Sequence, residues 1–202
     1  MNTIRTVELA CGMPLVVEEM SGVRSVGVSW LIPAGPAAEP TDRLGMSAMT
    51  AELLLRGAGS LDSRGHADAL DRLGVGRSAD ASGPHIRISA TMLGAQLMEA
   101  LPLIADMVRV PRLADESVEP ARDLALQELE SLQDNPQERA VLAARSRHFP
   151  EPHGRSSLGT EQGIRAVSGD DIRRFWSARA RPGGSILAIA GAVEAGAVRK
   201  RL

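Results

Sequence analysis

The segment that most constrains this chain is Arg43–Gly57, RLGMSAMTAELLLRG, which has the pattern of a helix with a small, apolar inner face. Its apolar residues recur at helical spacing, and Gly57-Ala58-Gly59 follows directly after Arg56. Glycine just past the last periodic residue is a common helix stop. The segment therefore predicts a helix over about 43–56 with one packed side.

The order of strands and helices predicts the fold class. Strands and helices follow one another without the regular alternation of βαβ units, which indicates an α+β fold with a mixed, largely antiparallel sheet packed against helices. The strand Ser25–Pro33, SVGVSWLIP, is apolar enough to be central. The other expected strands are Thr3–Leu9, Leu15–Glu18, Val75–Ala81, His85–Leu93 and Ser185–Ala190, and the other expected helices are Ser63–Leu73, 95–109, 114–133, 136–148 and 168–178.

Composition narrows the class of protein. The 202 residues carry a net charge of −2, which gives no sign of attraction to nucleic acid or to a membrane surface. No apolar run approaches the roughly 20 residues of a membrane span. The lone Cys11 excludes an internal disulfide and is interpreted as a structural or incidental thiol rather than a nucleophile. We expect a cytoplasmic, bacterial-type protein, or a periplasmic one if a signal peptide was removed.

The helix over 43–56 resembles the one that carries H-x-x-E-H in the insulinase/pitrilysin family, the inverted zincins. The chain is similar to that family along most of its length, and Phe149–Thr160, FPEPHGRSSLGT, resembles the family's H-P-x-G-x-x-x-x-G-T connection. Aligned with this sequence, the motif falls on residues 48–52. Ala48 and Glu52 therefore replace the two zinc histidines, and Ala51 replaces the general base.

The resemblance also places the rest of the family's metal site. The third ligand is a glutamate 76 residues after the second histidine, and this count from Glu52 reaches Glu128. A further acidic residue, seven positions earlier, falls on Ala121. Two carboxylates remain from a set that needs three protein ligands and an open position, so we expect no zinc, no other cofactor and no catalytic residue. Ala48, Ala51, Glu52 and Glu128 should nevertheless cluster, with an arginine partner or a protonated carboxyl near the two acids.

The histidines offer an alternative metal site. His66 is expected to be a surface or capping residue, and His153 lies in a proline-containing loop without helical geometry. A zinc peptidase that uses either histidine with Glu52 and Glu128 is the enzyme alternative. It is disfavoured because neither H-x-x-E-H nor H-E-x-x-H occurs in the chain.

The family binds peptides along an edge strand that faces the zinc. The corresponding strand here is about Val75–Ser82, where Ser78-Ala79-Asp80-Ala81 keeps only the alanine of the usual N-A-x-T. This departure weakens the case for the usual mode of peptide binding.

Taken with the resemblance, residues 1–202 are interpreted as one N-terminal-type domain of the family's roll-like fold, without the second repeat. The expected function is that of a non-catalytic homologue, a structural or regulatory half beside an active zinc-bearing subunit or second repeat. Such a half could contact a peptide substrate and could form a homodimer or heterodimer. A stand-alone protein-binding module is the third interpretation.

Overall fold

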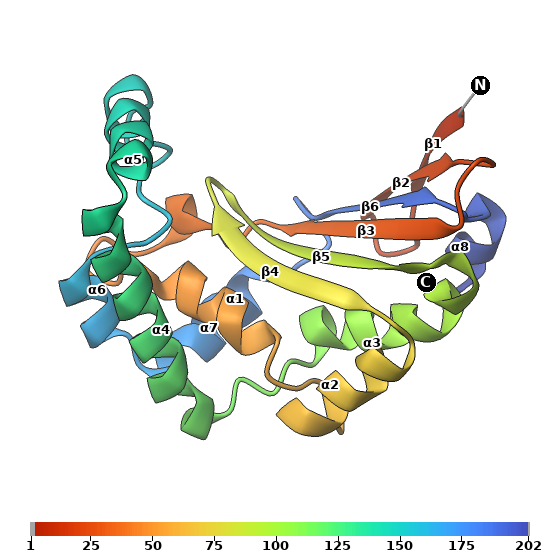
Figure 1. Cartoon of the computed structure of the whole chain (residues 1–202), viewed down its shortest axis with the longest axis horizontal. Coiled ribbons are helices and arrows are strands. Elements are labelled where there is room, and N and C mark those ends of the chain that lie inside the picture. Colours follow the sequence, from red (N-terminus) through yellow and green to blue (C-terminus); the bar gives the residue numbers. More distant parts are fainter. Residues whose placement is uncertain (1–2, 202) are drawn as a thin grey trace.

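The structure is a computed structural model that describes residues 3–201. Six strands form one sheet, and most of the helices lie on one side of it (Figure 1). This arrangement confirms the α+β class. The elements in chain order are β1 (Thr3–Glu8), β2 (Pro14–Glu19), β3 (Ser25–Ile32), α1 (Met46–Leu54), α2 (Ser63–Arg72), β4 (Gly76–Ser82), β5 (His85–Leu93), α3 (Leu97–Arg109), α4 (Val118–Ser131), α5 (Pro136–His148), α6 (Glu161–Ala166), α7 (Gly169–Arg179), β6 (Ile186–Gly191) and α8 (Ala195–Arg201).

The strand order across the sheet is β1-β2-β6-β3-β5-β4. The last strand, β6, inserts between the first hairpin and β3, where it runs parallel to β2 and antiparallel to β3. All other neighbouring pairs are antiparallel, so the sheet is mixed and largely antiparallel as expected. The central position expected for β3 is confirmed, and β4 and β1 form the two edges.

The core lies between the sheet and the helices. Along β3, Val26, Val28, Trp30 and Ile32 are buried, whereas the residues between them are partly or fully exposed. The helix expected over 43–56 is α1, and most of its residues are buried. It begins only at Met46, because Gly45 precedes it with a φ of 105°, a left-handed conformation that favours glycine.

Two helices were not expected from the sequence. The short helix α6 follows Thr160, and α8 follows β6, and neither is among the helices expected from the sequence. Helices of six and seven residues span fewer than two turns, which is too short for a clear hydrophobic period.

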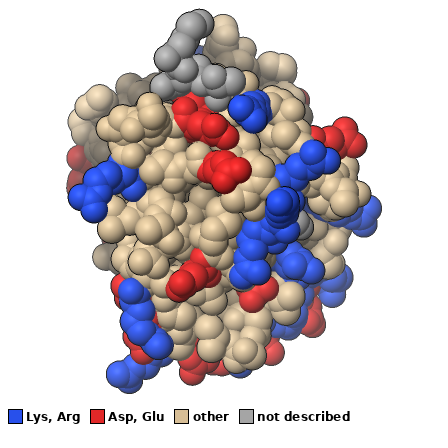
Figure 2. All heavy atoms as spheres, turned by 90° about the vertical axis from the view of Figure 1, so that its right-hand side faces the viewer, with Lys and Arg blue, Asp and Glu red and all other residues tan. Residues whose placement is uncertain are grey.

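Two surface properties accompany this fold. Within residues 3–201, no helix combines the length and apolar content that a bilayer crossing needs. Figure 2 shows acidic and basic side chains on the end of the molecule where β1 and α8 lie, with basic groups gathered along one side of that face. The helix α8, at this end, finishes with Arg199, Lys200 and Arg201.

Candidate functional site

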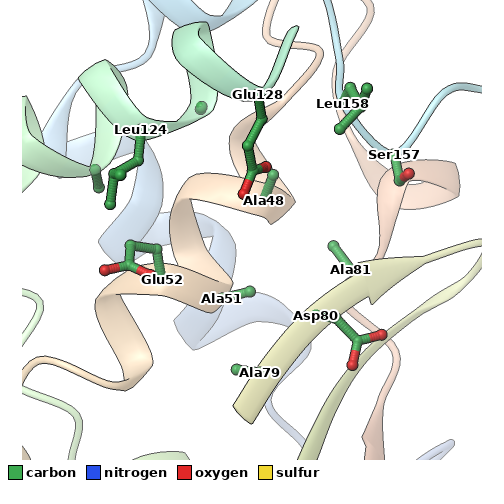
Figure 3. Close-up of a pocket in the computed structure, with 12 residues that line it drawn as sticks. Ala48, Ala51, Glu52, Ala79, Asp80, Ala81, Leu124, Glu128, Ser157 and Leu158 are labelled. Carbon is green, nitrogen blue, oxygen red and sulfur yellow. The ribbon is translucent and has the colours of Figure 1, made fainter. Parts of the chain in front are cut away.

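A cavity of about 250 Å³ lies between α1, α4, the edge strand β4 and the loop before α6 (Figure 3). Half of the residues that line it are alanines. The lining residues are Ala48, Ala51, Glu52, Ala79, Asp80, Ala81, Ala121, Leu124, Ala125, Glu128, Ser157 and Leu158. The structure therefore brings together Ala48, Ala51, Glu52 and Glu128, as expected, although the last lies 76 residues beyond Glu52.

Helical spacing explains how these residues meet. Ala48, Ala51 and Glu52 lie three and four residues apart on α1, so they share one side of that helix. On α4, Ala121, Ala125 and Glu128 repeat at the same kind of interval. In Figure 3, Glu128 extends from α4 toward Ala48. Two helices distant in sequence thus present matching sides to one cavity.

The two glutamates that face the cavity differ in their partners. The Glu52 carboxylate forms an ion pair with Arg56, one turn along α1, at 2.9 Å between Oε1 and Nη2. This pair supplies the arginine partner that the sequence predicted for two neighbouring acids. Glu128 is exposed, and within residues 3–201 its side chain makes no hydrogen bond or ion pair. The charge of the Glu52 carboxylate is therefore balanced by Arg56, whereas the Glu128 carboxylate is exposed to solvent.

Asp80 lines the cavity through its strand and not through its carboxylate. Side chains alternate along β4, and Figure 3 shows Ala79 and Ala81 on the cavity side. The Asp80 carboxylate lies on the other face of the sheet, where it accepts a hydrogen bond from Arg87 Nε at 3.1 Å. No third acid therefore joins Glu52 and Glu128.

The donor set does not fit a zinc ion. A catalytic zinc site needs three protein ligands, and alanine methyl groups at 48, 51 and 121 offer none. Of the two carboxylates, that of Glu52 already forms the ion pair with Arg56. Among residues 3–201, no three His, Cys, Asp or Glu side chains are grouped so as to hold a metal ion.

The histidines do not supply the missing ligands. His66 was expected at the surface, and this is wrong: it is fully buried between α2 and α3, because its ring packs into the core. Its Nε2 lies 3.1 Å from the carbonyl oxygen of Leu103, and its Nδ1 is buried without a hydrogen-bond partner. His153 is exposed in the loop after α5. Neither residue lines the cavity, so the alternative site with Glu52 and Glu128 is not assembled.

A buried acid that the sequence did not single out fixes the start of α1. The Glu39 carboxylate accepts hydrogen bonds from Gly45 N at 3.0 Å and from Ser47 N at 2.6 Å, and also from the Ser47 hydroxyl. Burial raises the pKa of the Glu39 carboxyl above its ordinary value, although these hydrogen bonds and the charge of Arg155 oppose the shift. The carboxylate satisfies amides at the helix N-terminus that have no intrahelical acceptor.

The loop before α6 supports the same end of α1. Arg155 Nη1 donates to the carbonyl oxygen of Glu39 at 2.7 Å, which ties the two loops together. Gly159 has a φ of 71°, and a Cβ there would lie 2.4 Å from the backbone of Gly45. This close approach requires glycine and accounts for the Gly159-Thr160 pair at the end of the loop.

Comparisons with known proteins identify the family and the fold. The family model for Insulinase (Peptidase family M16) matches residues 15–161. A Mycobacterium leprae protein described as an uncharacterized zinc protease is 27% identical over 184 residues, which are 91% of this chain and 41% of that protein.

Two solved structures share the fold. The peptidase M16 inactive domain from Pseudomonas fluorescens matches with a TM-score of 0.86 and 20% identity, over 98% of this chain and 49% of that one. The first half of the periplasmic protease PqqL from Escherichia coli matches with a TM-score of 0.87 and 14% identity, over 98% of this chain and 44% of that one. The chain thus spans less than half the length of each of these three proteins.

Proposed function

Because the chain belongs to the insulinase family, peptidase family M16, we propose that it is a non-catalytic member that acts as one half of a two-part assembly. Its partner is a homologous domain that carries the zinc site, either on a second subunit or as a second repeat. In this assembly the present chain supplies structure and contacts, and the partner supplies the metal chemistry.

One observation carries the proposal. The cavity between α1 and α4 stands where the family motif aligns, but methyl groups occupy the positions of a zinc histidine, the general base and the further acid. Zinc peptidases need the ligands to hold the ion and the base to take a proton from its bound water. Without them the cavity lacks the groups that zinc chemistry needs.

Two further observations support a paired role. The chain covers less than half of its relatives' length, so a second region of similar size exists in those proteins. The helix α5 has no buried residue, and its Val141 is 61% exposed. A 13-residue helix of this kind is marginal on its own, so a contact on α5 would stabilise it.

A free-standing protein-binding module is the second candidate, and the edge strand β4 favours it. Among residues 3–201 this strand pairs with β5 and with no second strand, so its outer edge can bind an extended peptide. Ala79 and Ala81 would then place that peptide beside the cavity.

Peptidase assays with the full chain test the proposal. The chain alone should not cleave denatured protein or peptide mixtures, whereas it should bind a family domain bearing H-x-x-E-H from the same genome and raise that domain's activity. Cleavage by the chain alone, abolished by a zinc chelator, would overturn the non-catalytic assignment. Absence of any complex with the zinc-bearing domain would favour the free-standing module.

A further inference from the structure

The cavity between α1 and α4 contains one carboxylate whose charge is not balanced. Glu128 lines the cavity and extends from α4 toward Ala48 (Figure 3). In the part of the chain that the structure describes, the Glu128 side chain makes no hydrogen bond or ion pair. The other acid at the cavity, Glu52, is already paired with Arg56. A ligand that enters this cavity therefore meets one unbalanced negative charge.

The rest of the cavity suits an aliphatic chain. Half of the lining residues are alanines, and Leu124 and Leu158 add further apolar surface. The volume of about 250 Å³ lies below the roughly 300–1,000 Å³ of pockets for drug-sized ligands, so it suits a single long side chain. Lysine and arginine place their methylene groups on apolar surface and keep the charged head at a polar group. Their shape and charge match those of the cavity.

The edge strand β4 provides a way for such a side chain to reach the cavity. Because β4 has β5 as its one neighbour among the described strands, an extended peptide can add to its outer edge. Side chains of an extended strand alternate between the two faces of a sheet. Every second side chain of the peptide would therefore lie on the same face as Ala79 and Ala81, which line the cavity.

We propose that the cavity is a specificity pocket for the cationic side chain of a bound peptide, a lysine or an arginine whose head pairs with the Glu128 carboxylate. The inference rests on the proposed function, because a zinc ion in the cavity would compete with that cation for the same carboxylate. A charge-assisted hydrogen bond to Glu128 favours the cation over a neutral side chain of the same length. An anionic side chain would be repelled, so charge determines which peptides bind.

Peptides that differ at one position test the proposal. The probe is a short, fluorescently labelled peptide of alternating threonine and glutamine with lysine, arginine, norleucine or glutamate at its centre. Fluorescence anisotropy measures its binding to the full chain. The lysine and arginine peptides should bind about tenfold more tightly than the norleucine peptide, which keeps an aliphatic side chain and lacks the charge. The glutamate peptide should bind most weakly.

Two substitutions on α4 separate the pocket from the general charge of that helix. Glu128→Gln keeps the size of the side chain and removes its charge, so the preference for lysine over norleucine should disappear. Glu130→Gln is the matched control, because Glu130 is exposed on the same helix and is not among the residues that line the cavity. This variant should keep the full preference.

A third substitution tests the cavity itself. Ala48→Leu narrows the space in front of Glu128, so the charged head should no longer reach the carboxylate and the preference for lysine should be lost. If this variant does not fold, as judged by circular dichroism, Ala81→Leu makes the same test from β4. A preference that persists in the folded variant would place the cation outside the cavity and overturn the proposal.

The remaining outcomes distinguish this proposal from the proposed function. Equal affinity for the lysine and norleucine peptides, or a preference that survives Glu128→Gln, would overturn the pocket and leave the non-catalytic assignment intact. Failure of all the peptides to bind at concentrations up to about 1 mM would overturn the pocket in the same way. About one zinc ion per chain in the same sample, together with cleavage of the peptides, would overturn both.

Discussion

The N-terminus of α1 and the cavity-facing side of the same helix are built in opposite ways. At the N-terminus, the buried carboxylate of Glu39 accepts hydrogen bonds from two backbone amides and one hydroxyl. Arg155, from the loop before α6, donates a hydrogen bond to the carbonyl oxygen of Glu39. On the cavity side, Ala48 and Ala51 present methyl groups and Glu52 pairs with Arg56. The support that positions the helix is complete, whereas the groups that would do chemistry are missing. The backbone support of a helix can therefore be kept where the residues of the family motif on that helix are replaced.

Restoring the motif should produce the largest effect. The triple substitution Ala48→His, Ala51→Glu and Glu52→His recreates both imidazoles on one side of α1, with Glu128 facing them across the cavity. We expect calorimetry to show zinc binding with a dissociation constant on the order of micromolar, or about 8 kcal/mol of binding free energy. Peptidase activity should remain weak or nil, because Ala121 supplies no acidic group beside the restored ligands.

The matched control adds Glu128→Ala to the same triple variant. Loss of that carboxylate should weaken zinc binding at least about tenfold, since even supporting groups commonly matter by that much. A well-folded triple variant that binds no zinc would show that the separation of α1 and α4 does not suit a metal site.

Removing the Glu39 carboxylate at the N-terminus of α1 should produce the next largest effect, a loss of folding stability. Glu39→Ala leaves the amides of Gly45 and Ser47 buried without their acceptor, and we expect a loss of about 3 kcal/mol in the free energy of unfolding. Urea denaturation measures it. Glu128→Ala, on the exposed acid at the cavity, should stay within about 0.5 kcal/mol. Equal losses for the two variants would remove the contrast between the two regions.

The raised pKa of Glu39 predicts a pH dependence with a definite sign. Its folded-state pKa lies above the unfolded value, so the folded state binds the proton more tightly. The contribution to stability is therefore greatest below the unfolded pKa and falls as pH rises through the folded pKa. Compared with Glu39→Gln, the unchanged chain should lose relative stability as pH rises from about 4.5, the usual carboxyl range. A relative stability that rises over the same window would contradict the assignment.

The smallest effect should come from the Glu52–Arg56 pair. Both side chains are partly exposed, so replacement of either by alanine should cost about 0.5 kcal/mol or less. A double-mutant cycle in urea measures the pair directly. A coupling energy of several kcal/mol between Glu52 and Arg56 would mean that the pair is far less solvated than the partial exposure of its two side chains indicates.

The parts of this molecule that could be predicted from sequence are those with a period or a fixed spacing. The helix around Ala48 and the strand β3 show clear apolar repeats, and the count from Glu52 to Glu128 placed two distant helices against one cavity. The order of elements gave the α+β class. Each of these features depends on local geometry or on a spacing that a resemblance supplies.

The features that could not be predicted depend on contacts between distant segments. Glu39 caps α1 from six to eight residues before its hydrogen-bond donors, across a loop that has no helical period. The burial of His66 follows from the packing of α2 on α3, since nothing in its neighbouring residues marks it as apolar. The position of β6 between β2 and β3 also depends on distant segments, because β6 comes from the far end of the chain and no local pattern indicates its neighbours.

The metal content of the dialysed full chain tests the central claim most directly. Inductively coupled plasma mass spectrometry should find zinc far below one ion per chain, with no change in Glu52→Ala or Glu128→Ala, because the cavity offers too few donors. About one zinc ion per chain, lost in either variant, would contradict the account and show that Glu52 and Glu128 bind a metal ion.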